Sequence, residues 1–206
     1  MSERKMRGFT LLEVMVVVSL SVIAAAVAML GLQPLLQSSR VASAFNVTLA
    51  ALRQARDLSV AQRQSYFVTF SNAAIPNTVT ITQTGTGTVI DTYKLPQDVT
   101  FVAVAGIPTS KATVPDGFGA GNVAIAFDQG IAAGNPNIVY FMPDGTAEDN
   151  AAGLGNGSGN LNNGVLYIAR AGQLYSSYAI TVWGATGRIR GWRLFNNTGT
   201  PYWKEN

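Results

Sequence analysis

Apolar residues dominate one unbroken stretch near the start of the chain and become sparser after it. From Phe9 to Leu32 the sequence contains a single charged residue, Glu13, and the next charge is Arg40. A run of this length matches the roughly 20 apolar residues that cross a bilayer as a helix. The pattern therefore predicts a transmembrane helix over residues 9–32, with one carboxylate near its start.

The apolar pattern continues beyond this span with helical spacing. Four large apolar side chains recur at steps of four, four and three residues: Val41, Phe45, Leu49 and Leu52. This spacing is typical of one buried helix face, so residues 33–64 are expected to form the amphipathic, exported half of the same helix. Pro34 is expected to kink or locally open it, because proline removes one backbone hydrogen bond.

After residue 64 the pattern changes to short β-branched and aromatic runs between Gly, Asn and Pro turns, which is typical of antiparallel strands. The expected strands are residues 66–70, 79–83, 89–93, 99–104, 123–127, 138–141, 165–169, 178–183 and 189–195. Residues 84–87 are expected to close a hairpin, and residues 106–122 and 144–163 to form loops. The predicted fold class is α+β, a long N-terminal helix packed on antiparallel β-sheets in residues 65–206.

The composition excludes several kinds of catalytic and metal site. The 206 residues include no cysteine and no histidine, which excludes thiolate and imidazole metal sites and Ser-His-Asp or Cys-His nucleophiles. The acidic residues Asp144, Glu148 and Asp149 lack the spacing of an EF-hand loop, and we expect an Asp-Gly turn there. We therefore expect a protein that is not an enzyme and that holds neither a cofactor nor a metal.

The residues around the span predict its orientation and raise a question about Glu13. Arg4, Lys5 and Arg7 precede the span, so the positive-inside rule predicts a cytoplasmic N-terminus and export of residues after about 35. A carboxylate inside a bilayer costs about 3 kcal/mol or more unless a partner neutralises it. A plain signal anchor would account for the span but not for Glu13.

The residues before and within the span carry a motif. Residues 5–14 read KMRGFTLLEV and resemble the class III signal of type IV pilins and type II secretion pseudopilins: a basic leader, a Gly, a Phe, and a Glu four residues later. The resemblance implies that a prepilin peptidase removes residues 1–8 by cutting after Gly8 and that the new amine of Phe9 is methylated. It also implies that Glu13 attracts the N-terminal amine of a neighbouring subunit and sets the register of a fibre.

Two later segments are similar to the GspH/FimT branch of pseudopilins: residues 139–146 (VYFMPDGT) and 178–190 (YAITVWGATGRIR). The resemblance implies a periplasmic GspH/FimT-like domain in a single-pass protein of the bacterial inner membrane. Its implied function is that of a minor pseudopilin near the tip of a type II secretion pseudopilus. The implied partners are the prepilin peptidase, other pilin or pseudopilin subunits, the inner-membrane assembly platform and, before assembly, membrane lipid.

An alternative function arises from the sequence Gly187-Arg188-Ile189-Arg190. In a strand Arg188 and Arg190 point the same way, about 7 Å apart, which approximates the spacing of successive phosphates on one DNA strand. The FimT side of the branch includes minor pilins that bind DNA for natural transformation through a C-terminal Gly-Arg-x-Arg motif. Arg193 and Lys204 would extend such a site, whereas the other interpretation is an ordinary solvated or subunit-facing strand.

Overall fold

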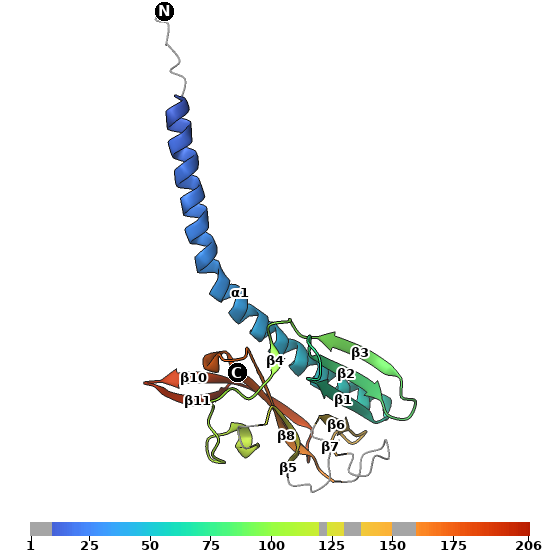
Figure 1. Ribbon diagram of the computed structural model, residues 1–206. Coiled ribbons are helices and arrows are strands. Elements are labelled where there is room, and N and C mark those ends of the chain that lie inside the picture. Colours follow the sequence, from blue (N-terminus) through green and yellow to red (C-terminus); the bar gives the residue numbers. More distant parts are fainter. Residues whose placement is uncertain (1–9, 120–122, 130–136, 150–159) are drawn as a thin grey trace, which may run out of the picture. The chain divides into compact units, whose positions relative to one another are not determined.

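The computed structural model describes residues 10–119, 123–129, 137–149 and 160–206. The chain divides into two compact units, residues 1–39 and 40–206. Helix α1 (Leu11–Gln62) belongs to both units, the first containing its apolar part and the second its amphipathic part (Figure 1). The described remainder of the second unit contains two sheets, two short 3₁₀ helices and the loops that connect them.

Helix α1 agrees with the single long helix that the sequence predicts. It begins at Leu11, directly after Thr10, and ends at Gln62, where Arg63 takes a positive φ of 53°. The backbone remains helical at Pro34, so the expected local disturbance does not end the helix. In the second unit Val41, Phe45 and Leu52 are buried and Leu49 is partly buried, which confirms the predicted helix face.

The strands form two antiparallel sheets, as short turns between successive strands favour. The first sheet has the order β3-β2-β1-β6-β7: β1 (Tyr66–Ser71), β2 (Thr78–Gln83), β3 (Val89–Lys94), β6 (Ile138–Phe141) and β7 (Ala147–Glu148). The second has the order β11-β10-β9-β8-β4, with β5 also paired to β8: β4 (Thr100–Phe101), β5 (Ile125–Gln129), β8 (Asn163–Ala169), β9 (Tyr178–Trp183), β10 (Arg188–Asn197) and β11 (Thr200–Glu205).

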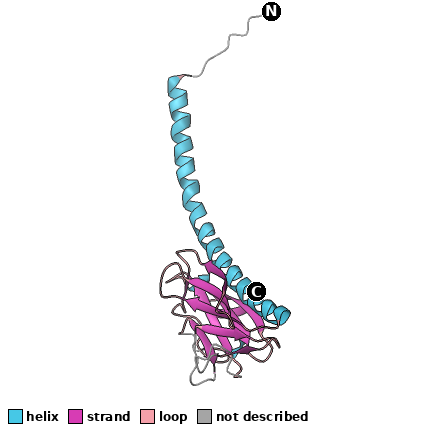
Figure 2. Ribbon diagram, turned by 90° about the vertical axis from the view of Figure 1, so that its right-hand side faces the viewer, coloured by secondary structure: helices cyan, strands magenta, loops and turns pink. Residues whose placement is uncertain are grey.

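The second half of α1 and the two sheets share one hydrophobic core. Figure 2 shows this part of the helix lying alongside the strands. Phe45 of the helix packs on Tyr178 of β9 with ring centroids 4.8 Å apart, and Phe70 of β1 stacks on Phe127 of β5 at 5.2 Å. These contacts join all three layers in one core, and the predicted α+β class is confirmed.

The opposite face of the second sheet is covered by an irregular segment. The expected loop of residues 106–122 contains the short 3₁₀ helix η1 (Pro115–Gly117) in its described part. Ile107 and Phe118 from this segment pack into a smaller cluster with Val165, Tyr167 and Leu194. The second sheet is therefore buried on both faces, and the covering segment brings Asp116 to the sheet.

Four strands differ from the prediction. β4 is only two residues long instead of spanning 99–104, and β5 is shifted two residues toward the C-terminus. β7, which lies in the expected 144–163 loop, and β11 were not expected. β11 was not predicted because it contains Pro201, and proline is usually absent from strands. β11 lies at the edge of its sheet, where a missing backbone donor is tolerated.

Candidate functional site

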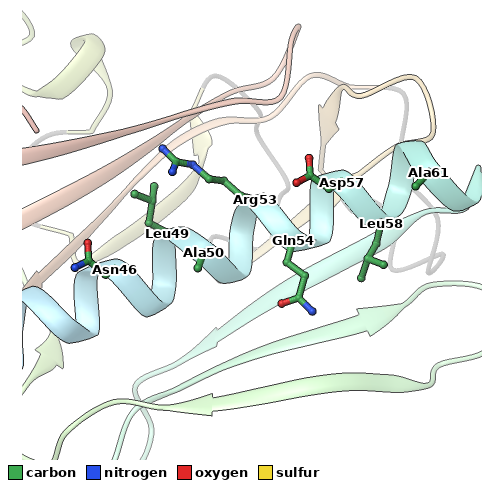
Figure 3. A pocket seen from close by; sticks show the side chains of 8 residues that line it. All are labelled: Asn46, Leu49, Ala50, Arg53, Gln54, Asp57, Leu58 and Ala61. Carbon is green, nitrogen blue, oxygen red and sulfur yellow. The ribbon is translucent and has the colours of Figure 1, made fainter.

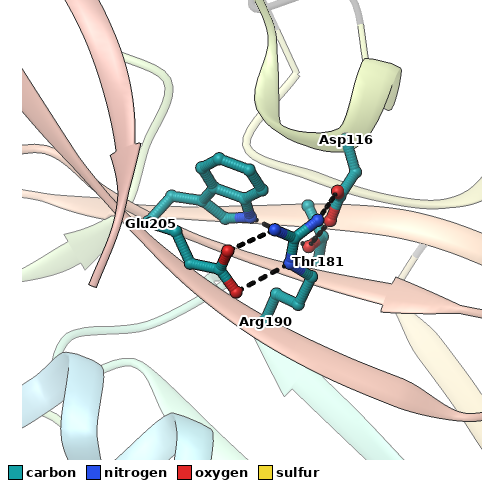
Figure 4. Close-up of polar contacts among 5 residues, drawn as sticks. Asp116, Thr181, Arg190 and Glu205 are labelled. Atoms are coloured by element: carbon teal, nitrogen blue, oxygen red, sulfur yellow. Dashed lines mark hydrogen bonds and ion pairs between the residues drawn. The ribbon is translucent and has the colours of Figure 1, made fainter.

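Arg190 lies on β10 and bonds to two carboxylates from distant parts of the chain (Figure 4). Its Nε donates to Glu205 Oε1 at 2.8 Å, and its Nη2 also pairs with Glu205. Its Nη1 donates to Asp116 Oδ1 at 2.5 Å. The Asp116 side chain is only 4% exposed, so its charge depends on this arginine for compensation.

Further polar contacts extend this group around Asp116. Thr181 donates from Oγ1 to Asp116 Oδ2 at 2.5 Å and accepts a hydrogen bond from Trp192 Nε1 at 3.0 Å. The guanidinium of Arg190 lies 4.7 Å from the centre of the Trp192 ring. The hydrogen bonds from Arg190 lower the pKa of Glu205 below its ordinary value. The network therefore links η1, β9, β10 and β11, and Arg190 is its centre.

The structure separates the four basic residues that the sequence placed in one DNA-binding patch. Arg188 and Arg190 lie on one face of β10, as their alternation predicts. Arg193 is three residues beyond Arg190 and therefore lies on the opposite face. Lys204 pairs directly with Arg193 across β10 and β11. The pleat thus turns Arg193 and Lys204 away from Arg190, so the four residues do not share one face, and DNA binding by any of them stays a prediction.

Arg188 lies beside the turn between β9 and β10, which docks on α1. Arg56 of the helix donates from Nη2 to the Thr186 carbonyl at 3.1 Å. Gly187 has a φ of 56°, and a Cβ there would collide with Gly145 and Arg56. A groove of about 470 Å³ at this docking point is lined by Arg53, Arg56, Asp57, Thr186, Gly187, Arg188 and Ile189. Arg188 is exposed and forms no ion pair with any described residue.

The exposed side of α1 carries a second, larger groove. Its volume is about 590 Å³, and Figure 3 shows its lining residues: Asn46, Leu49, Ala50, Arg53, Gln54, Asp57, Leu58 and Ala61. Arg53 and Asp57 are both exposed and do not pair with each other. The groove therefore combines apolar surface with two charges of opposite sign, which suits a protein partner.

Of the three acidic residues near β7, Asp144 forms the predicted turn, whereas Glu148 belongs to β7 itself. Asp144 Oδ1 accepts hydrogen bonds from Thr146 Oγ1 at 2.7 Å and Thr146 N at 2.9 Å. These bonds lower the pKa of Asp144. In residues 10–119, 123–129, 137–149 and 160–206, no three His, Cys, Asp or Glu side chains converge on a possible metal position. Residues 150–159 of the expected 144–163 loop lie outside the described residues.

Glu13 lies in the first turn of α1. Thr10 Oγ1 accepts a hydrogen bond from the backbone N–H of Glu13 at 3.2 Å, so Thr10 is the N-cap and Glu13 the third helical residue. This is the Thr-x-x-Glu spacing of a capping box, of which the described residues form only the half made by Thr10. An acidic residue in the first turn also interacts favourably with the helix dipole, so Glu13 has a local structural role besides any role in assembly.

The other polar groups of the apolar segment are satisfied within the helix. Residues Leu11–Met29 have a mean hydropathy of 2.5, and none of them is buried. Ser19 and Ser21 donate to the carbonyls of Met15 and Val17, at 2.7 and 2.8 Å. The Glu13 carboxylate, by contrast, has no ion pair or hydrogen bond with any described residue. Glu13 is thus the polar side chain of Leu11–Met29 that has no partner among the described residues.

The N-terminal segment also matches a known family. A family described as "Prokaryotic N-terminal methylation motif" matches residues 4–29, which include Glu13. The chain carries a type IV pilin-like prepilin signal. This prepilin signal supports the pilin and pseudopilin class, membrane anchoring by the apolar helix, processing by a prepilin peptidase and assembly with other pilin subunits. No curated protein and no solved structure matches the chain.

The predicted processing residues are not described by the structure, whereas the partners of Arg190 are described but were not predicted. Gly8 and Phe9 lie outside the described residues, so cleavage and methylation there stay predictions from the prepilin signal. Asp116 and Glu205 were not predicted as partners of Arg190. After position 169 the sequence contains five basic residues and a single acidic one, Glu205. This imbalance is a signal that could have identified Glu205 as an ion-pair partner. Asp116 has no comparable signal.

Proposed function

We propose that this protein is a minor pseudopilin of a type II secretion system, a structural and non-catalytic subunit near the tip of the pseudopilus. The observation that carries the proposal is Glu13, an uncompensated carboxylate within a matched prepilin signal. Cleavage after Gly8 would create a new amine at Phe9. On this proposal Glu13 pairs with that amine on a neighbouring subunit.

The electrostatics of an apolar fibre core support this role. A carboxylate and an ammonium about 4 Å apart in a low dielectric attract by several kcal/mol. Leaving either group unpaired there is strongly unfavourable. A subunit leaving the bilayer would therefore stop at the axial position where Glu13 meets its partner. Such a pair would fix the register between subunits, while the apolar surface of Leu11–Met29 would supply contact area.

Features of the second unit support a specialised subunit. The groove on α1 combines apolar and charged residues along a solvent-exposed helix face (Figure 3). Trp183 and Tyr202 are 39% and 42% exposed. Exposed large aromatic side chains of this kind are typical of protein interfaces. The assignment to secretion and to the GspH branch rests on the resemblance of residues 139–146 and 178–190.

The proposal is tested by Glu13→Val in the native cell, with Ser19→Val as the matched control. Both substitutions replace a polar side chain of the span, but Ser19 already bonds within its own helix. We expect the Glu13→Val protein to insert and be cleaved normally but to lose co-purification with its partner subunits. The Ser19→Val protein should keep them. Normal co-purification of Glu13→Val would refute the role of Glu13.

A second candidate function is DNA capture by a FimT-like minor pilin. The exposed side chain of Arg188 favours it, because Arg53 and Arg56 line the same groove. Arg190 favours it less, since three of its N–H groups already bond to carboxylates. The test is an electrophoretic shift of duplex DNA by the full chain and by Arg188→Gln with Arg190→Gln. An equal shift by both proteins would exclude this function for the two arginines.

A further inference from the structure

Strand β10 runs along α1 toward the residue at which the second unit begins. At its start, Gly187 lies against Arg56, and a Cβ at Gly191 would collide with the ring of Phe45. The strand thus advances from Gly187 to Gly191 while its contacts on the helix move back eleven residues, from Arg56 to Phe45. The rest of β10 and its partner β11 continue past Phe45 in the direction of Arg40. The far end of this two-stranded ribbon thus lies at the Arg40 end of the second unit.

The far end of the ribbon presents two cross-strand pairs on one face. Arg193 lies opposite Lys204, and two residues further Phe195 lies opposite Tyr202. The guanidinium of Arg193 lies 5.3 Å from the Phe195 ring centre and 5.5 Å from that of Tyr178. The rings of Phe195 and Tyr202 are 6.0 Å apart. We call Arg193, Phe195, Tyr202 and Lys204 the ribbon face.

The positive charge of the ribbon face is not compensated within the described chain. Like charges directly opposite each other on two strands destabilise the pair. Arg193 and Lys204 are both exposed, and neither forms an ion pair with a described residue. Glu205 points to the other side and bonds to Arg190. Asp98 already pairs with Arg40 and Arg170. An anionic partner from outside the chain would relieve this repulsion.

We infer that the ribbon face docks on the anionic phospholipid headgroups of the bilayer that holds residues 11–29. Its composition fits this partner, because aromatic side chains settle at the headgroup level and basic side chains extend toward the phosphates. The chain also restricts the distance. Only residues 30–39 separate the apolar segment from Arg40, so the chain keeps Arg40 within about 40 Å of that segment even when fully extended.

The tether explains why two cations are sufficient. Each basic side chain near an anionic membrane changes the binding equilibrium about fivefold, so the pair gives about 25-fold. That is weak for a free protein, but anchoring to the same bilayer makes the encounter intramolecular. Docking would hold the domain at the membrane before assembly and would be lost when the subunit enters a fibre.

Single-stranded DNA is a poorer fit for the ribbon face. Proteins that bind it surround its backbone with a basic groove, and this face is an open ribbon.

The experiment uses the full chain in nanodiscs and rests on the membrane insertion contained in the proposed function. The chain has no cysteine, so Thr200→Cys, in the exposed residue that follows the turn of the ribbon, accepts a single fluorophore. Lipids with a spin label on the headgroup quench this fluorophore when the ribbon is docked. Phosphatidylglycerol should increase the quenching over phosphatidylcholine alone, and Arg193→Gln with Lys204→Gln should reduce the docked-to-undocked ratio about 25-fold.

A charge-matched control separates docking from net charge. Lys94→Gln with Lys111→Gln removes the same charge from two exposed residues elsewhere in the second unit and should leave the quenching unchanged. The inference is overturned if the ribbon variant is quenched like the parent. It is also overturned if the ribbon variant no longer binds DNA added to the nanodiscs while quenching by the labelled lipids is unaffected. Flotation with lipid is measured separately, so failure to insert would count against the proposed function and not against the ribbon face.

Discussion

Glu13 and Arg190 lie in different units of the chain and differ in how their charges are compensated. Arg190 bonds to Asp116 and Glu205, which come from segments far apart in the sequence. The Glu13 carboxylate has no such partner in the described residues, although it begins an apolar helix. A charge with two internal partners stabilises the domain that contains it. A charge without one is available to a second chain. The contacts of Arg190 therefore stabilise the domain, and the proposed function gives Glu13 its role in assembly.

The comparison is tested most strongly by removing the charge of Arg190. Arg190→Gln would leave the buried Asp116 carboxylate without its ion pair, and we expect the free energy of unfolding to fall by about 2 kcal/mol. Arg188→Gln is the matched control, because an exposed residue without an ion pair should change it by less than about 0.5 kcal/mol. Denaturant unfolding of the full chain in detergent measures both, since all three tryptophans lie in the second unit.

Two results would break the comparison at Arg190. Equal stability of Arg190→Gln and Arg188→Gln would show that the network does not hold the domain together. Loss of co-purification by Arg190→Gln at unchanged stability would assign Arg190 an assembly role like that of Glu13. The expected pattern is the reverse for the two residues, with Glu13→Val affecting assembly and leaving unfolding of the second unit unchanged.

A smaller effect is expected from acid. Arg190 lowers the pKa of Glu205 below its ordinary value of 4.5, so Glu205 stays ionised to a lower pH when the domain is folded than when it is unfolded. Its contribution to stability is complete above about pH 4.5 and is lost as the pH falls through the lower, folded-state pKa. Thermal unfolding of the parent and of Glu205→Gln should therefore converge as the pH falls below 4.5.

Asp144 provides the control for this acid dependence. Thr146 lowers its pKa in the same direction, so part of the decline in stability should persist in Glu205→Gln. Asp144→Asn should remove that part without affecting the part due to Glu205. A constant difference in melting temperature between the parent and Glu205→Gln from neutral pH to acid would contradict a stabilising contribution of the Arg190–Glu205 ion pair.

Local patterns in the sequence predicted the elements of the fold but not the contacts between distant segments. The spacing of Val41, Phe45 and Leu52 predicted the buried helix face, because periodicity is a property of neighbouring residues. The sequence would also have allowed us to predict that Arg193 and Arg190 lie on opposite faces, since residues an odd number of positions apart in a strand point to opposite faces. Strand β11 was not predicted because Pro201 opposes a strand locally, and only its edge position permits it.

The network around Arg190 was beyond such patterns. Asp116 is 74 residues away in the sequence and approaches β10 only because the covering segment packs Ile107 and Phe118 on the sheet. Asp116 also takes a positive φ of 51°, which no neighbouring residue predicts. The sequence instead identified Glu13, because a single carboxylate in an apolar run is unusual without any knowledge of tertiary contacts.

The most direct test of the central claim is chemical cross-linking of the Glu13 carboxylate to the N-terminal amine of a neighbouring subunit. Assembled fibres are made with an isotopically heavy copy of this chain among light partner subunits and treated with a membrane-permeant carbodiimide, which joins only groups already in contact. Mass spectrometry then identifies whether the peptide that contains Glu13 is linked to the N-terminal peptide of its own chain or to that of another subunit. Our account predicts a link to another subunit that is absent from Glu13→Gln. Fibres in which Glu13 is linked only within its own chain, or not at all, would contradict it.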